Sequence, residues 1–301
     1  MTTPVASVVV PTYDRPRPLE ACLEALSEQS FREPWEVVVV DDGSPQPLDR
    51  LAERLDGRLP LRLLRQERSG PAAARNRGVR EAHGEFVAFT DDDCRPDPQW
   101  LATLVGAARE RPGSLVGGST WNGLPDDLFA STSQLIADLV YAHFNRDPER
   151  AHFLASNNIL CPRERFLTMG GFDESFPRPG AEDRDFCDRW RASGWPIAWC
   201  ARARVEHRHP QTLAKFVELH FRYGRGARVY QLKRRDRAAD GIDDDPGFHS
   251  ALPGRVRPRL AAFGSPPRRA AALASLDVWQ AANAAGFAVE ALGGSSRKGA
   301  S

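Results

Sequence analysis

Three consecutive carboxylates, Asp91-Asp92-Asp93, follow an apolar run at residues 86–89. Two carboxylates at positions i and i+2 after a buried strand can bind one hard divalent cation, and the phosphate oxygens of a ligand can complete its coordination. Most acidic triplets are solvated loops, but an apolar run directly before the triplet favours a strand that ends there. The spacing therefore predicts that Asp91 and Asp93 form a cation site.

Two further polar clusters follow apolar runs in the first hundred residues. The run at 5–10 leads into the cluster at 11–14, and the run at 36–40 leads into the cluster at 41–44. Ligands of open α/β sheets bind outside the carboxyl ends of the strands. Together with the acidic triplet, these clusters predict a single binding edge.

Helices must separate these strands if they are to lie parallel in one sheet. Leu19, Cys22, Leu23 and Leu26 recur with the spacing of an amphipathic helix. Further segments of the first hundred residues read as helices at 48–55 and 71–83 and as a strand at 61–64. This alternation predicts βαβ units and an α/β sheet.

The remainder of the chain is less regular. Helices are expected at 100–109, 128–144 and 270–292, and short strands at 197–200 and 203–205, just before His207. Residues 238–268, which are rich in Asp, Pro and Gly, predict an irregular linker, and the tail is expected to be disordered from about residue 293.

Six segments, taken in order and spacing, resemble the family 2 glycosyltransferases over about residues 5–235. These segments lie at 8–15, 38–44, 70–78, 89–93, 170–174 and 182–186. The resemblance implies a GT-A-like single α/β domain with a mixed, mostly parallel central sheet flanked by helices. Residues 1–99 would be its nucleotide-binding half and 100–235 its acceptor-binding half, followed by a helical C-terminal extension over 236–301.

The implied activity is transfer of a sugar from a nucleotide-diphosphate donor to a hydroxyl, with inversion at the anomeric carbon and with Mg²⁺ or Mn²⁺. UDP is the favoured nucleotide and dTDP the next, because Asp41 would accept the N3–H of either base. The residues expected to contact the nucleotide are Pro11, Thr12, Tyr13, Asp14, Asp41, Asp42, Arg75, Asp91 and Asp92.

The resemblance also implies a ligand set for the metal. Asp93, Asp91 and His207 are the expected ligands, with His209 as the rival of His207. Many relatives carry another aspartate where this chain has Cys94. Because Asp91 and Asp93 are both present, this departure concerns only an auxiliary carboxylate.

An inverting transfer needs one carboxylate that takes the proton of the attacking hydroxyl. The resemblance assigns this role to Asp183 and leaves Glu182 to orient the acceptor or the helix. Alternatively, both are first-turn residues favoured by the helix dipole, which does not explain the preceding turn at 170–174. The expected acceptor contacts are Asn157, Asn158, Gly171, Phe172 and Asp173, although buried, satisfied amides would give the same pattern at the two asparagines.

Composition excludes several other classes of protein. Among 301 residues, 41 basic and 40 acidic side chains give a net charge of +1, which argues against a dedicated nucleic-acid binder. The five cysteines form no Cys-x-x-Cys pair, which predicts free thiols in a reducing cytoplasm. No stretch approaches the ~20 apolar residues of a transmembrane helix.

Residues 202–237 are nevertheless strongly basic, with aromatic residues among the arginines. This pattern predicts peripheral contact with anionic lipid at the inner face of the plasma membrane, which suits a lipid-linked acceptor. The expected pathways are bacterial polysaccharide, glycolipid or glycosylated-metabolite synthesis. The alternative is a solvated helix face with residues that close over the donor phosphates. The helix at 270–292 is expected to pack against the protein or to form a homodimer. It is not expected to anchor the chain in a membrane, because Asp277, Gln280 and Asn283 interrupt its apolar sequence.

Two other functions remain open at this point. A sugar-nucleotidyltransferase would need a glycine-rich loop with a lysine after the first strand, but no lysine precedes Lys215. A non-catalytic nucleotide-sugar-binding or scaffold protein would be expected to lack Asp91, Asp93 or Asp183, and all three are present.

Overall fold

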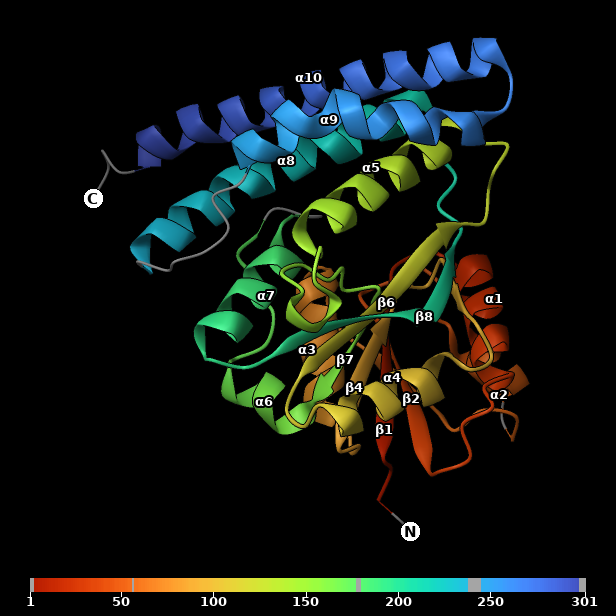
Figure 1. Cartoon of the computed structure of the whole chain (residues 1–301). Helices are drawn as coiled ribbons and strands as arrows, with labels where there is room; N and C mark the ends of the chain where they lie inside the picture. The colour runs from red at the N-terminus through yellow and green to blue at the C-terminus, as the bar shows by residue number, and fades with distance from the viewer. Residues whose placement is uncertain (1–2, 56, 177–179, 238–244, 298–301) are drawn as a thin grey trace. The chain divides into compact units, whose positions relative to one another are not determined.

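Apolar runs rich in valine form the parallel part of an eight-stranded sheet in the computed structural model (Figure 1). The parallel strands are β1 (Ala6–Thr12), β2 (Trp35–Asp41), β3 (Leu61–Arg65) and β4 (Phe86–Thr90), in the order β3-β2-β1-β4. Every residue of β1 and β4 is buried, as expected for strands covered on both faces. The predicted strands of the first hundred residues are confirmed.

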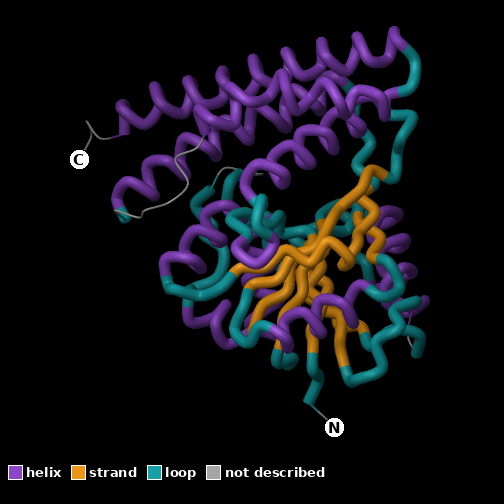
Figure 2. Tube along the Cα trace, in the orientation of Figure 1, coloured by secondary structure: helices purple, strands orange, loops and turns teal. Residues whose placement is uncertain are grey.

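The sheet continues beyond β4 with strands from the less regular part of the sequence (Figure 2). These are β7 (Asn158–Pro162), β6 (Leu115–Asn122), β8 (Ile197–His207) and β5 (Cys94–Pro96), and the pairs β4–β7, β6–β7 and β5–β8 are antiparallel. The sheet is therefore mixed, as predicted. The expectation of two short strands at 197–205 is wrong, because β8 runs on through its exposed residues 201 and 202.

The described residues are 3–55, 57–176, 180–237 and 245–297, and they divide into two units. The first unit comprises 1–121, 147–174 and 186–208, and the second comprises 122–146, 175–185 and 209–301. The predicted domain end at residue 235 falls inside the last turn of helix α8 (Leu213–Asp236).

Helices of the first unit bury apolar stripes against the sheet. α1 (Pro16–Ser27) does so with the four residues of its predicted stripe. The other helices of this unit are α2 (Asp49–Leu55), α3 (Pro71–Glu81), α4 (Trp100–Glu110) and α6 (Arg163–Thr168). The unit also contains the 3₁₀ turn η1 (Pro148–Arg150), none of whose residues is buried. The helix α7 (Glu182–Ala192) begins in the second unit and ends in the first.

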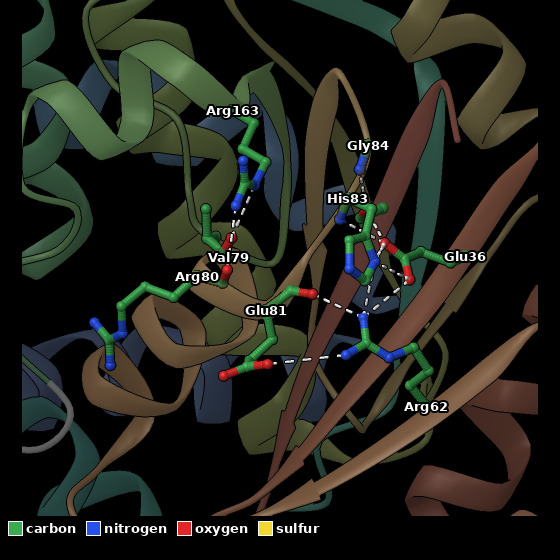
Figure 3. A network of polar contacts seen from close by, with 9 residues as sticks. Glu36, Arg62, Val79, Arg80, Glu81, His83, Gly84 and Arg163 are labelled. Carbon is green, nitrogen blue, oxygen red and sulfur yellow. Dashed lines mark hydrogen bonds and ion pairs between the residues drawn. The ribbon is translucent and has the colours of Figure 1, made fainter. Parts of the chain in front are cut away.

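α3 lies close to the sheet because of a glycine. A Cβ on Gly78 would lie 2.4 Å from Cγ1 of Val9, so a larger residue would push the helix away from β1. Three carbonyls in the last turn of the helix accept hydrogen bonds from two arginines (Figure 3). Arg163 donates to Val79 and Arg80 at 3.0 and 3.1 Å, and Arg62 donates to Glu81 at 2.7 Å.

Glu36 of β2 is the buried carboxylate of the same network (Figure 3). It accepts hydrogen bonds from the Ser7 hydroxyl at 2.8 Å and from the backbone N–H of His83 at 2.7 Å. Burial alone would raise the pKa of Glu36, but the hydrogen bonds from His83, Ser7 and Arg62 lower it below its ordinary value. Glu36 therefore joins β1, β2 and the segment after α3.

Replacing Glu36 by alanine is expected to lower the free energy of unfolding by about 2–4 kcal/mol, because the buried hydroxyl of Ser7 and the partly buried N–H of His83 lose their acceptor. Urea titration at neutral pH would measure the loss. Glu33→Ala is the control, since Glu33 forms an exposed pair with Arg109 and its removal should leave stability nearly unchanged. Equal losses in the two variants would contradict the role given to Glu36.

The second unit is built from helices. These are α5 (Leu128–Phe144), α8, α9 (Asp245–Arg259), the 3₁₀ turn η2 (Leu260–Phe263) and α10 (Pro266–Arg297). α8 and α10 approach closely at Gly224, where a Cβ would lie 1.9 Å from the carbonyl oxygen of Asn283. None of the helices in the described part of the chain combines the length and hydropathy of a transmembrane span.

Two expectations about the C-terminal region are wrong. Residues 245–259 of the predicted linker form α9, because Phe248, Leu252 and Val256 recur at every fourth position and pack into the core of this unit. Residues 238–244 lie outside the described residues. The expected disordered tail is helical as far as Arg297, and 298–301 lie outside the described residues.

His220 of α8 is buried among aromatic rings, with Phe216, Tyr223 and Trp279 at centroid distances of 4.4, 5.7 and 6.3 Å. Neither ring nitrogen has a hydrogen-bond partner among the described residues. Burial lowers the pKa of His220 to about 4. The unfolded chain therefore takes up a proton near pH 6.5 that the folded chain takes up only near pH 4.

Stability is accordingly expected to fall as the pH drops from 7 to 4.5, with His220 contributing about 2–3 kcal/mol of the loss. His220→Phe should reduce the difference between the free energies of unfolding at these two pH values by that amount. Urea titrations at both pH values would measure it. An unchanged pH dependence in His220→Phe would refute the prediction.

Candidate functional site

The predicted binding edge exists in the first unit. Thr12 and Asp41 are register partners at the ends of β1 and β2, and Asp91 directly follows β4, which pairs with β1. The three polar clusters thus meet at the carboxyl edge of parallel strands, as the sequence predicts. Within the acidic triplet, the side chains of Asp92 and Asp93 are 5% and 4% exposed, whereas that of Asp91 is 29% exposed.

Arg15, just before α1, holds the two buried carboxylates. Its Nη1 lies 2.8 Å from Oδ1 of Asp92, and its Nη2 lies 2.8 Å from Oδ2 of Asp93. The Thr12 hydroxyl donates to the other oxygen of Asp92 at 2.7 Å. Burial raises the pKa of Asp92 to about 7, even though the positive charge of Arg15 opposes this shift.

These contacts give Asp92 a structural role. Both of its oxygens contact protein groups, so Asp92 fastens β1 to the acidic turn, and its expected nucleotide contact stays a prediction. Sequence reasoning did not single out Arg15 as a site residue. Its position at the end of the 8–15 segment was the available signal.

The second oxygen of Asp93 faces a different set of groups. Oδ1 lies 3.4 Å from Nε2 of His207 and 4.0 Å from Sγ of Cys94. Cys94 and His207 are register partners in the β5–β8 ladder, which places them side by side. Burial would lower the pKa of His207, but the Asp93 carboxylate beside it raises the pKa above its ordinary value.

One ligand atom from each of Asp93, Cys94 and His207 lies within 4.8 Å of the others. A carboxylate, an imidazole and a thiol are common ligands of divalent metal ions, so this cluster fits a cation. Asp91 does not belong to the cluster. Its Oδ1 accepts a hydrogen bond from Nη2 of Arg75 at 2.6 Å, and the structure thus joins Asp93 and His207 of the predicted set but adds Cys94.

Asp41 and Asp42 have different surroundings. Oδ1 of Asp41 accepts a hydrogen bond from the Ser44 N–H at 2.9 Å. Asp42 accepts hydrogen bonds from the N–H groups of Ser69 and Gly70 at 2.8 and 2.7 Å, and so fixes the loop that opens α3. These contacts give Asp42 a backbone role, and its expected nucleotide contact stays a prediction.

The segment after β1 carries an aromatic ring next to a cation. The guanidinium of Arg68 lies 3.9 Å from the centre of the Tyr13 ring, a contact that the sequence did not indicate. Asp14 adopts a positive φ of 52°, and its N–H donates to the Ser44 hydroxyl at 2.9 Å. Pro11 is buried within β1.

Asn158 was expected to contact the acceptor, but it is fully buried in the sheet. Its Oδ1 accepts a hydrogen bond from Trp100 at 2.8 Å, and its Nδ2 donates to the carbonyls of Ser119 and Ala203 at 3.0 Å each. Its role is therefore structural, which was the alternative left open. Asn157, partly buried, precedes the residue paired with Thr90 and so lies at the end of the strand beside Asp91.

Gly171 and Phe172, two more expected acceptor contacts, form a turn held by Asn76 of α3. Asn76 accepts a hydrogen bond from the Phe172 N–H and donates one to the Phe172 carbonyl, both at 2.8 Å. Gly171 has φ +73°, and a Cβ there would lie 2.4 Å from Oδ1 of Asn76. The Phe172 ring is buried against Phe89, so both residues shape the turn, whereas Asp173 is partly exposed.

Glu182 and Asp183 open α7, as predicted, and both belong to the second unit. Oε2 of Glu182 accepts a hydrogen bond from the Gly180 N–H at 3.1 Å, and Oδ1 of Asp183 accepts one from the Arg184 N–H at 2.8 Å. Glu182 is buried and Asp183 is partly exposed. These contacts agree with an orienting role for Glu182 and leave the base assignment of Asp183 a prediction. The rival histidine, His209, also lies in the second unit.

Three arginines of the basic segment form ion pairs with carboxylates of the protein. Arg225 pairs with Glu290 at 2.8 Å, Arg237 pairs with Asp185 at 2.7 Å, and Arg222 pairs with Glu218. These pairs agree with a solvated helix face, which is part of the alternative, and contact of the segment with lipid stays a prediction.

A mixed sheet whose parallel strands end at Asp41 and just before Asp91, with Arg75 of α3 bound to Asp91, has the features of a nucleotide-sugar glycosyltransferase of the GT-A fold. The family model for Glycosyl transferase family 2 matches residues 7–168, and the chain belongs to this family.

Relatives within the family carry out different transfers. The chain is 28% identical over 229 residues to the glucosyl-dolichyl phosphate glucuronosyltransferase of Haloferax volcanii, a match covering 72% of this chain and 73% of that protein. It is 29% identical over 248 residues to the validoxylamine A glucosyltransferase of Streptomyces hygroscopicus subsp. jinggangensis, covering 71% and 59%. It matches only 22% of the hyaluronan synthase of Pasteurella multocida.

A solved structure agrees on the fold. The mannosyltransferase PcManGT from Pyrobaculum calidifontis, in complex with GDP-Man and Mn²⁺, superposes with a TM-score of 0.66 and 23% identity. The superposition covers 96% of this chain and 88% of that one.

Proposed function

We propose that this chain transfers a sugar from a nucleotide-diphosphate donor to the hydroxyl of an acceptor, with inversion at the anomeric carbon. The observation that carries the proposal is the meeting of Asp41, Arg75, Asp91 and the Asp93 cluster at one edge of the sheet. A scaffold protein would not need a preserved cation cluster beside a nucleotide edge, and a nucleotidyltransferase would need the lysine that this edge lacks.

UDP is the first candidate nucleotide and dTDP the second. Asp41 ends β2 with a carboxylate that can accept the N3–H of either base, and Tyr13 offers a ring for stacking. The GDP-Man complex of the mannosyltransferase makes GDP the third candidate.

In the proposed reaction, Asp183 takes the proton of the acceptor hydroxyl as that oxygen attacks the anomeric carbon. Glu182 orients the start of α7, and Arg75 contacts the donor phosphates or ribose beside Asp91. Asp93 and His207 would hold Mg²⁺ or Mn²⁺, which when bound neutralises charge on the departing diphosphate.

The acceptor is proposed to be a saccharide, a lipid-linked saccharide or a small hydroxylated molecule. The printed names of two relatives, a glucosyl-dolichyl phosphate enzyme and a validoxylamine A enzyme, support the second and third kinds. We place the reaction in the cytoplasm, because nucleotide sugars and free thiols are both typical of that compartment.

Calorimetric binding of UDP, dTDP, GDP and ADP, each with Mn²⁺ and with EDTA, tests the nucleotide site. Cation-dependent binding of one diphosphate is expected and would direct the donor search to the sugars of that nucleotide. If the folded protein bound no diphosphate at all, the site at Asp41, Arg75 and Asp93 would be wrong, and a scaffold function would replace it.

A further inference from the structure

We propose that the sulfur of Cys94 is a direct ligand of the divalent cation, so that the cation site has carboxylate, imidazole and thiolate ligands. The proposal rests on the proposed function for the presence of a cation at this edge, and it goes beyond it in naming a sulfur ligand. Among the described residues, Asp93, Cys94 and His207 form the single group of three such side chains that could share an ion.

The backbone brings the sulfur to the site. Cys94 begins β5 directly after the acidic triplet, and its ladder partner across the β5–β8 pair is His207. Neighbouring ligand atoms around a tetrahedral ion with bonds of about 2.0–2.3 Å lie roughly 3.3–3.8 Å apart. The separations of 3.4 Å from Asp93 to His207 and of 4.0 Å from Asp93 to Cys94 are therefore close to those of a bound site.

Arg15 keeps the shared carboxylate in the required orientation. Because its Nη2 lies 2.8 Å from Oδ2 of Asp93, Oδ1 is the oxygen directed at both His207 and Cys94. Fixing one oxygen of a ligating carboxylate by an outer hydrogen bond is a common feature of protein metal sites.

Coordination by Cys94 exchanges a proton for the metal ion. The thiol loses its proton to solvent, the S–H bond breaks, and the sulfur lone pair forms the bond to the cation. No oxidant or reductant takes part, and the formal charge of the metal does not change.

A sulfur ligand alters which ion binds best. Mg²⁺ prefers oxygen ligands, whereas Co²⁺ and Zn²⁺ accept thiolate and imidazole readily and Mn²⁺ is intermediate. We therefore expect binding to strengthen in the order Mg²⁺, Mn²⁺, Co²⁺, Zn²⁺.

Titration of the whole protein with Co²⁺, with and without UDP, tests the proposal without an activity assay. A sulfur-to-cobalt charge-transfer band in the near ultraviolet is expected in the unsubstituted protein. Cys94→Ser should remove the band and weaken Co²⁺ binding by at least about tenfold. Cys200→Ser is the matched control, because Cys200 lies on the same strand as His207, β8, but outside the cluster.

The outcomes separate this proposal from the proposed function. Binding of Co²⁺ together with UDP, but without a sulfur band, would overturn the role of Cys94 and leave the transferase standing. A band that persists in Cys94→Ser would also overturn it. Binding of neither cation nor diphosphate to the folded protein would overturn both. The charge-transfer band of the unsubstituted protein is itself a test of sulfur coordination. The proposal can therefore be refuted even if the Cys94→Ser variant does not fold.

Discussion

Asp93→Asn is expected to weaken the cation-dependent binding of nucleoside diphosphate by more than about 100-fold. The substitution removes the charged ligand that His207 and Cys94 share, and it also removes the partner of Arg15. Binding measured in EDTA should change far less, because the residues around Asp41 remain. Calorimetry with Mn²⁺ and with EDTA separates the two contributions.

Asp97→Asn provides the control for this experiment. Asp97 follows the same acidic turn but forms a partly exposed pair with Arg204 at 3.9 Å, away from the cluster. Its replacement should leave both binding curves unchanged. If Asp93→Asn behaved in the same way, the cation site would have to lie elsewhere.

Asp183→Asn is expected to lower turnover by about 10²–10⁴-fold and to leave donor binding intact. The asparagine keeps the size of the side chain and can still accept the hydrogen bond from the Arg184 N–H, but it cannot take a proton. Release of nucleoside diphosphate from the sugar donor would measure turnover, and calorimetry would measure donor binding.

Glu182→Gln is the matched comparison, since Glu182 is the adjacent acid in the same helical turn. Its loss of turnover should be smaller, because its carboxylate contacts the backbone N–H of Gly180. A larger loss in Glu182→Gln than in Asp183→Asn would mean that Glu182 is the general base and Asp183 the orienting residue. Full turnover in Asp183→Asn would refute the assignment of Asp183 as the base.

The sequence predicted the nucleotide edge well because continuous valine-rich runs leave little choice of structure. Runs such as those of β1 and β2 must be buried on both faces, and parallel strands bring their polar ends to one edge. Asp41, Asp91 and Asp93 follow from this reasoning alone. Asp92 does not, since its contacts with Thr12 and Arg15 depend on which way each carboxylate of the triplet turns.

Other features depended on contacts between distant residues. Asn158 has the residue type of a ligand contact, and only its partners Trp100 and Ala203 identify it as part of the sheet. The sequence does not predict the helix α9, because the prolines and glycines of this segment indicate an irregular linker. Its apolar residues at every fourth position were the signal that a search for periodicity could have found.

The way α3 is held has a consequence for protein engineering. Asp42 fixes the loop before the helix, and Arg163 fixes its last turn. Two consecutive residues of the helix, Arg75 and Asn76, contact different parts of the protein. Arg75 contacts Asp91 of the donor edge, whereas Asn76 holds the turn at 171–172. Residues 69–78 and 170–174 should therefore be replaced together when segments of this chain are exchanged with those of a relative. A chimera that takes the turn from a relative without its helix would disturb Arg75 as well, and a graft that transfers both segments together should retain the donor site.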